Sequence, residues 1–180
     1  TPCGTLFPYT TLFRSLYAVE LGTDAASDTT LAALNKSFDF AAVERANQAC
    51  VDARVAAAHF VMFGGPGETR ETLQEGLDNL ERLEHCVVFA YAALRIFPGT
   101  LLQQRAREEG LITAETPLLK PVYYLSPAVD KDWLDATVEE AWRGRRDRIF
   151  PPAAGRERLE IMQRFGYKGI LWDTLIRWPE

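Results

Sequence analysis

The sequence predicts an α/β fold: part of a TIM-like (βα) barrel with about three parallel strands, followed by a mainly α-helical C-terminal extension. Three apolar runs of strand length, residues 16–21, 56–63 and 87–96, alternate with two longer segments of helical periodicity. Alternation of strand and helix with short loops is typical of parallel βαβ units. The runs are apolar at nearly every position, as in parallel strands that are buried on both faces.

Each crossover helix has a start signal in the sequence. Asp39 precedes the first helix and Thr69 the second, and both residue types are preferred N-caps. Leucines recur every three or four residues in the second helix, which gives it one apolar side for packing on the sheet. A basic run at residues 143–148 follows a later helix, and we expect it to be the solvated C-terminus of that helix.

The chain is expected to have three parts. Residues 16–100 would form the C-terminal half of the partial barrel, and residues 101–180 a helical extension packed on it, because the apolar tail is unsuited to solvent. Residues 1–15 are expected to be a non-native artefact, since TLFPYTTLFRS at 5–15 lacks regular periodicity and resembles a translated sequencing adapter. The native chain would then begin near Leu16, inside a domain whose first part is missing.

Composition disfavours several classes of protein. The chain carries a formal net charge of −5, which disfavours a broad nucleic-acid surface, and 47% of its residues are apolar, as in globular proteins. No apolar run reaches the roughly 20 residues that span a bilayer, and no signal peptide is visible. We therefore expect a cytoplasmic protein with no nucleic-acid partner and no membrane span.

The sequence predicts no metal site. Cys3, Cys50 and Cys86 lack the spacing of a zinc site or of an iron–sulfur loop, and the last two lie in apolar segments as small buried hydrophobic residues do. The two histidines, His59 and His85, have no second metal ligand nearby. No catalytic residue is assigned, because no nucleophile–base pair is apparent.

Loops at residues 22–27, 64–69 and 97–100 follow the three predicted strands and should converge on one site, because C-terminal strand ends face one mouth of an α/β barrel. Along the first strand, Glu20 and Asp24 share a face if the strand remains extended. Glu20 lies in an apolar strand and needs a partner. Two alternatives remain open for the partner of the Glu20 carboxylate. One is a ligand, through its hydroxyls or an amine. The other is an ion pair with the arginine at position 95, which would otherwise hold a ligand carboxylate.

Glycines at positions 64, 65 and 67 allow close approach of the backbone in the second loop. Three interpretations remain: a phosphate cradle at a helix N-terminus, a surface for a flat neutral ligand, and a simple strand-to-helix turn. Glu68 and Glu71 at this terminus, and the lack of Lys or Arg in the loop, disfavour phosphate.

Together the three loops resemble those of radical S-adenosylmethionine (SAM) enzymes. GTDAAS at 22–27 is similar to the G-x-E-S-G-S segment after the fourth barrel strand of that family. FGGPGET at 63–69 is similar to the loop after the fifth strand, and RIFPGT at 95–100 to the R-I-x-P-G-T end of the sixth. YYLSP at 123–127 resembles a further signature of the cobalamin-binding subgroup, which includes Mg-protoporphyrin cyclase-like and lipid-biosynthesis enzymes.

The resemblance implies a partial barrel that binds SAM at its strand tips. The sequence departs from the family pattern at Asp24, where Glu is usual, and at Ala25, where Ser is usual. The implied SAM-binding residues, from the ribose or methionine end to the adenine side, are Glu20, Gly22, Asp24, Gly64, Gly65, Gly67, Arg95, Ile96 and Pro98.

In this family a [4Fe–4S] cluster on a Cys-x-x-x-Cys-x-x-Cys loop cleaves SAM reductively and so starts radical chemistry. The resemblance implies an unknown small-molecule substrate, such as a lipid or a tetrapyrrole-like compound. The resemblance implies that the cluster and cobalamin belong to the full-length protein only, and that this fragment is inactive alone. Two alternatives stand beside it. One is another α/β-barrel enzyme that binds a phosphate ester, and the other is a non-enzymatic helical interaction module built on residues 101–180.

Overall fold

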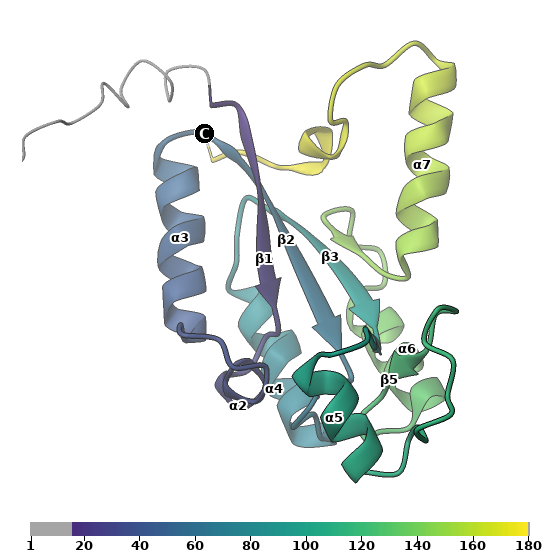
Figure 1. Cartoon of the computed structure of the whole chain (residues 1–180). Helices are drawn as coiled ribbons and strands as arrows, with labels where there is room; N and C mark the ends of the chain where they lie inside the picture. The colour runs from purple at the N-terminus through teal and green to yellow at the C-terminus, as the bar shows by residue number, and fades with distance from the viewer. Residues whose placement is uncertain (1–15, 180) are drawn as a thin grey trace, which may run out of the picture.

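A computed structural model describes residues 16–179, which contain a four-stranded parallel sheet in the order β1-β2-β3-β6 (Figure 1). The α/β class is confirmed, with one parallel strand more than the sequence predicted. Residues 16–179 do not close this sheet into a barrel. The strands are β1 (Ala18–Asp24), β2 (Ala56–Phe63), β3 (Val87–Ala92) and β6 (Arg148–Ile149).

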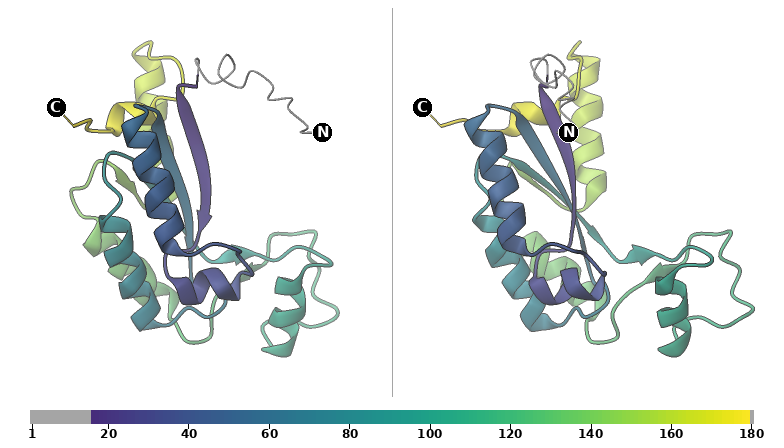
Figure 2. Two further views of the ribbon diagram at one scale, coloured as in Figure 1. Left: turned by 90° about the vertical axis from the view of Figure 1, so that its left-hand side faces the viewer. Right: turned by 60° about the vertical axis from the view of Figure 1, so that its left-hand side comes forward.

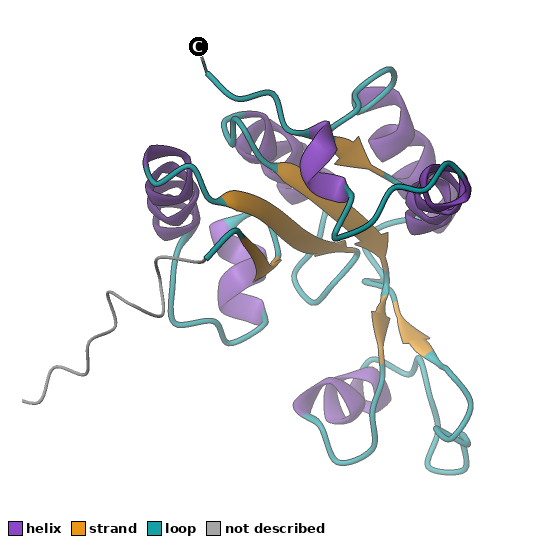
Figure 3. Cartoon of the chain, turned by 90° about the horizontal axis from the view of Figure 1, so that it is seen from above, coloured by secondary structure: helices purple, strands orange, loops and turns teal. Residues whose placement is uncertain are grey.

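One face of the sheet is covered by helices (Figures 1 and 3). Their apolar sides pack on alternate strand residues, including Ala57, Val61 and Val88, in one buried cluster. The N-caps predicted at Asp39 and Thr69 are confirmed, because each side chain accepts a hydrogen bond from the backbone three residues on. The helices are α2 (Asp28–Ala33), α3 (Phe40–Asp52), α4 (Arg70–Glu81) and α6 (Lys131–Ala141).

The opposite face, which we call the open face, is covered by residues 16–179 only near the ends where the strands begin (Figure 2). There α7 (Pro152–Arg164) and the short helix η2 (Trp172–Leu175) lie against the sheet. Trp172, Leu175 and Ile176 pack on a second buried cluster of strand residues, so the apolar tail returns to the sheet. The predicted division at residue 100 stays a prediction, although the later segment adds β6 and this tail to the same sheet.

β6 was missed by the sequence analysis, which placed residues 143–148 at a solvated helix end. That expectation is wrong for Arg148, which is only 4% exposed. Its guanidinium donates hydrogen bonds to the carbonyls of Leu80 (2.9 Å) and Leu83 (2.7 Å). Leu80 lies in the last turn of α4 and Leu83 in the segment just after it, so the arginine joins β6 to the C-terminal end of α4.

The predicted strand over residues 87–96 is two strands, because the chain turns at Ala93, whose φ is 69°. Beyond that turn, β4 (Leu94–Arg95) pairs antiparallel with β5 (Tyr123–Tyr124), and α5 (Leu101–Glu108) packs beside them. We call residues 94–124 the small lobe. It has its own buried cluster, which includes Ile96 and Tyr124, and it projects from the sheet beyond the strand ends (Figures 2 and 3). Within residues 16–179, no helix has the length and apolar character to cross a membrane.

Candidate functional site

The carboxyl ends of β1, β2 and β3 lie at one edge of the sheet, which we call the carboxyl edge, because the three strands pair in parallel. The loops that follow them contact one another. Position Gly67, after β2, lies 3.1 Å from Ala33 of the segment after β1, measured from the place of a glycine Cβ. By the same measure Gly65 lies 3.2 Å from Leu94, which follows β3. The glycine loop therefore contacts α2 and β4, which lie near the other two predicted loops, and the convergence of residues 22–27, 64–69 and 97–100 on one site stays a prediction.

Glu20 and Gly22 lie on the open face of β1. Glu20 is exposed, and its Oε1 accepts a hydrogen bond of 3.2 Å from the indole Nε1 of Trp172. The alternative of an ion pair between Glu20 and Arg95 is wrong. The Arg95 guanidinium instead lies 4.7 Å from the ring centroid of Phe97. Trp172 was not expected at the site, because it is 152 residues from Glu20 in the sequence.

Asp24 ends β1 in a left-handed conformation, with φ of 62°, and the strand register shifts between Gly22 and this residue. Its carboxylate pairs with the ammonium group of Lys36. The same carboxylate lies 3.7 Å from the place that a Cβ on Gly22 would take. Asp24 therefore reaches the face that Gly22 presents, as the sequence predicted for an extended strand, although the backbone bends there.

The glycines of the second loop lie against the protein itself. Gly64 has φ of 78°, and a Cβ there would lie 2.4 Å from a methyl group of Leu125. Gly67 has the same φ, a conformation that favours glycine. Both glycines, and the loop as a whole, are thus required by the turn and by close packing. The predicted approach of this backbone to a ligand stays a prediction.

The buried carboxyl group of Glu68 accepts a backbone hydrogen bond within the glycine loop. Its residue is 3% exposed, and its Oε2 accepts a hydrogen bond of 3.2 Å from the backbone N–H of Gly64. Its Oε1 accepts a bond of 2.6 Å from the hydroxyl of Thr72. Burial raises the pKa of this carboxyl. A carboxyl group that already uses the loop donor disfavours phosphate binding here.

At the third loop, Arg95 and Pro98 are exposed, whereas Ile96 is fully buried in the small lobe. The backbone N–H of Ile96 donates to the carbonyl of Val122 over 2.8 Å. Arg95 and Pro98 are thus available to a ligand at the carboxyl edge, and Ile96 holds their loop in place.

Aromatic side chains line the open face next to Gly22, and the sequence analysis missed their role. The rings of Phe60 and Phe89 stack with centroids 5.1 Å apart, and the rings of Phe60 and Tyr91 with centroids 6.4 Å apart. Tyr91 is 37% exposed. The signal was present in the sequence, because these residues occupy alternate positions along β2 and β3 and so share one face.

The described residues do not fit an iron–sulfur cluster. Within residues 16–179, no group of three or more metal-ligating side chains is gathered at one place. Cys86 is buried, and this burial raises the pKa of its thiol to about 11, which disfavours the thiolate that binds metals. Cys50 is half-buried with a raised pKa, also from burial. Cys3 lies outside the described residues.

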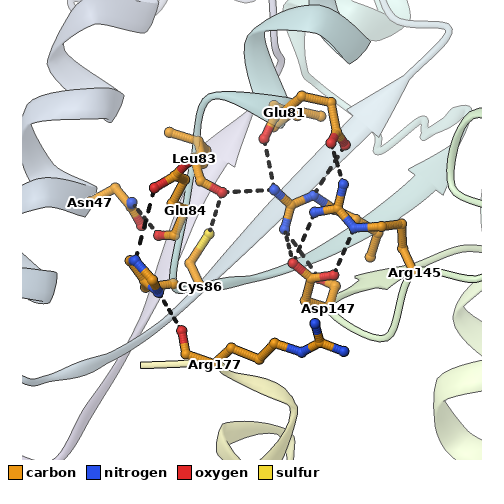
Figure 4. Close-up of polar contacts among 11 residues, drawn as sticks. Asn47, Glu81, Leu83, Glu84, Cys86, Arg145, Asp147 and Arg177 are labelled. Carbon is orange, nitrogen blue, oxygen red and sulfur yellow. Dashed lines mark hydrogen bonds and ion pairs between the residues drawn. The ribbon is translucent and has the colours of Figure 1, made fainter. Parts of the chain in front are cut away.

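A second polar cluster lies at the opposite edge, where β3 and β6 begin, which we call the amino edge (Figure 4). Arg145 donates two hydrogen bonds of 3.0 Å to Asp147 and a further one to Glu81. The larger cavities of the described structure, of about 700 and 630 Å³, also lie here. Their charged groups are mostly paired with each other, so we place the candidate site at the carboxyl edge despite the size of these cavities.

The fold is similar to that of a solved structure, the radical S-adenosylmethionine methyltransferase TsrM from Kitasatospora setae with cobalamin and a [4Fe–4S] cluster bound. The two share 21% sequence identity with a TM-score of 0.71, over 88% of this chain and 38% of that one. The chain thus spans well under half the length of that protein, and the likeness concerns the fold. No protein-family model matches the chain, and no curated protein matches it by sequence.

Proposed function

We propose that this chain is part of a cobalamin-dependent radical SAM enzyme, and that its carboxyl edge and open face form one wall of the SAM site. One observation carries the proposal. Segments that resemble the family motifs occur in order along the chain, and the segments that follow β1, β2 and β3 contact one another at one edge of the parallel sheet. The likeness in fold to a radical SAM methyltransferase supports the same conclusion.

The chemistry of the wall supports a ligand with hydroxyl and amino groups. Among the described residues, Trp172 engages only one of the two oxygens of Glu20, and Asp24 adds a second carboxylate at the same edge. Gly22 leaves room between these carboxylates, because only Asp24 lies within 4 Å of its missing Cβ. When bound, SAM supplies an activated methyl or adenosyl group. The residues of this chain would bind and orient it, with Gly65, Gly67, Arg95 and Pro98 on the adenosine side and with Gly64 and Ile96 holding the loops of that side in place.

The cluster and cobalamin are assigned to other parts of the full-length protein, since residues 16–179 do not fit a [4Fe–4S] site. The exposed aromatic ring of Tyr91, stacked on Phe60, supports an apolar small-molecule substrate such as a lipid or a tetrapyrrole.

Two other functions fit the structure less well. A phosphate ester would meet the buried carboxyl group of Glu68 at the glycine loop. A separate helical interaction module over 101–180 would have to leave the sheet, to which this segment contributes β6 and the buried residues of the tail.

The proposal is tested by calorimetric titration of the 180-residue chain with SAM, S-adenosylhomocysteine and a sugar phosphate. SAM is expected to bind and the sugar phosphate is not. A Gly22→Val substitution should weaken SAM binding by about tenfold or more, because the added side chain occupies the space beside the two carboxylates. The matched control is Ala114→Val, which adds bulk at an exposed loop position.

Gly22→Val is a clean probe because the structure predicts little cost in stability. Gly22 lacks the left-handed φ that requires glycine, and its Cβ would make only ordinary contact with Asp24 at 3.7 Å. Valine also suits a strand. Binding of the sugar phosphate in preference to SAM would support a different barrel enzyme, and equal SAM affinity of wild type and Gly22→Val would contradict the proposed wall.

A further inference from the structure

A strained turn lies at the end of β1. The N–H of Ala25 donates to the carbonyl of Thr23 over 2.7 Å, which closes a three-residue γ-turn centred on Asp24. Asp24 has φ of 62°, and this left-handed form of the γ-turn is rare and strained. Such a conformation persists only where the surrounding structure holds it.

Buried hydrogen bonds anchor the chain on both sides of this turn. Before the turn, the hydroxyl of Thr23 lies 2.8 Å from Nδ1 of His59. After the turn, the side-chain amide of Asn79 donates to the carbonyl of Ala26 over 2.7 Å. Thr23 is 3% exposed and His59 is fully buried, so water does not compete for the first anchor.

The hydrogen bond between Thr23 and His59 is followed by one between His59 and Asn47 of α3, and the contacts of Asn47 determine which atom donates in each bond. Asn47 donates its amide N–H to the carbonyl of Glu84 over 2.9 Å, so its carbonyl oxygen faces Nε2 of His59, 3.1 Å away. Nε2 must therefore carry the proton, and Nδ1 accepts from the hydroxyl of Thr23. Burial, with the charge of Arg148, lowers the pKa of His59 to about 4, so this neutral form is the one present at neutral pH.

We propose that Asn47, His59 and Thr23 form a positioning relay that holds the Asp24 turn in its ligand-binding shape. The proposal rests on the proposed function, because it gives Asp24 a role toward SAM. The buried hydroxyl of Thr23 faces His59 on the helix-covered side, whereas the carboxylate of Asp24 lies beside Gly22. The relay thus couples the buried core to the position of one carboxylate at the carboxyl edge.

The test compares Thr23→Val, which keeps the shape and removes the hydroxyl, with Thr23→Ser, which keeps the hydroxyl. Thr23→Val should weaken SAM binding about tenfold, and Thr23→Ser about twofold or less. In an Asp24→Asn background, Thr23→Val should add little further loss, since the relay acts through that carboxylate. Should Thr23→Val fail to fold, Asn47→Ala breaks the far end of the relay and should give a smaller loss in the same direction.

A second readout needs no ligand. Hydrogen exchange of the Ala25 amide, which closes the turn, should be faster in Thr23→Val than in Thr23→Ser. Equal exchange in the two variants would overturn the relay, whether or not the chain binds SAM. Full additivity of Thr23→Val with Asp24→Asn would overturn it as well. Failure of the wild-type chain to bind SAM, with the expected exchange difference intact, would instead count against the proposed function alone.

Discussion

The polar groups at the two edges of the sheet differ in their burial and in their partners. At the amino edge, Arg145 holds Asp147 (Figure 4), and the guanidinium of Arg148 is buried against the carbonyls of Leu80 and Leu83. At the carboxyl edge, the chain is held in strained or glycine-dependent turns at Asp24 and Gly64, while Glu20 remains exposed. Positive φ occurs at both edges, since His85 and Gly144 at the amino edge also have it. The comparison teaches that the edges differ in their polar groups, because the amino edge buries a paired arginine whereas the carboxyl edge leaves Glu20 exposed.

The largest expected effect is a loss of stability caused by a substitution at the amino edge. An Arg148→Met substitution removes the charged donor to the carbonyls of Leu80 and Leu83, which keep only longer hydrogen bonds from the Leu83 N–H and the Cys86 thiol. We expect the free energy of unfolding to fall by about 4 kcal/mol for the two lost bonds from a charged group, measured by urea denaturation. Under conditions where the variant is folded, its SAM affinity should equal that of wild type. A stability loss below about 1 kcal/mol would show that this edge is not the structural one.

The next effect concerns pH and the buried histidine beside the carboxyl edge. Burial lowers the pKa of His59 to about 4 in the folded protein, below its ordinary value of 6.5, so the unfolded chain binds the proton more tightly. Stability from this group is therefore complete above pH 6.5 and is lost as the pH falls toward 4, by up to about 3 kcal/mol.

The measurement for this pH effect is urea unfolding of wild type and His59→Gln between pH 7 and pH 4. Carboxyl groups that titrate in the same range affect both proteins and cancel in the difference. The stability advantage of wild type should shrink as the pH falls. An advantage that stays constant would mean that His59 does not titrate in this window.

A smaller effect separates two kinds of glycine at the carboxyl edge. Gly64→Ala should destabilise the fold by about 2 kcal/mol, because its φ is 78° and Leu125 fills the space of the new methyl group. Gly22→Ala is the matched control and should leave stability within about 0.5 kcal/mol, since no such contact exists there. Thermal unfolding measures both, and equal losses would remove the distinction between a packing glycine and a ligand-facing one.

The smallest effect concerns the exposed part of the amino edge. Arg145→Gln removes ion pairs with Asp147 and Glu81 that are partly solvated. Only about 0.5 kcal/mol of stability should be lost at low salt, and less in high salt, where exposed pairs are screened. Urea unfolding at two salt concentrations measures this. A loss as large as that of Arg148→Met would show that the arginines act as one unit.

The sequence predicted the elements whose signals are local. The apolar runs that became β1, β2 and β3 are long and flanked by turns, and Asp39 and Thr69 cap their helices as expected. It missed β6, because this strand has only two residues, one of them an arginine, and exists through pairing with Val88 and Phe89. Pairing with residues that are distant in the sequence leaves no local pattern, so the sequence could not predict this strand.

The same limit applies to the candidate site. That the carboxyl ends of β1, β2 and β3 share one edge followed from parallel topology, which depends on element order alone. The partner of Glu20 did not, because Trp172 reaches it through a tail that packs back across the sheet. The sequence also left open whether the glycine loop approaches a ligand or packs internally, and only the position of Leu125 against Gly64 shows the internal contact.

The central claim is that an adenosyl ligand binds at the carboxyl edge. It is tested most directly by adding SAM to the isotope-labelled chain and following backbone amide chemical shifts residue by residue. The account predicts that the perturbed amides cluster at Gly22, Asp24, Gly65 and Arg95. Perturbations confined to Glu84, His85 and Asp147 at the amino edge, with the carboxyl edge unchanged, would contradict it.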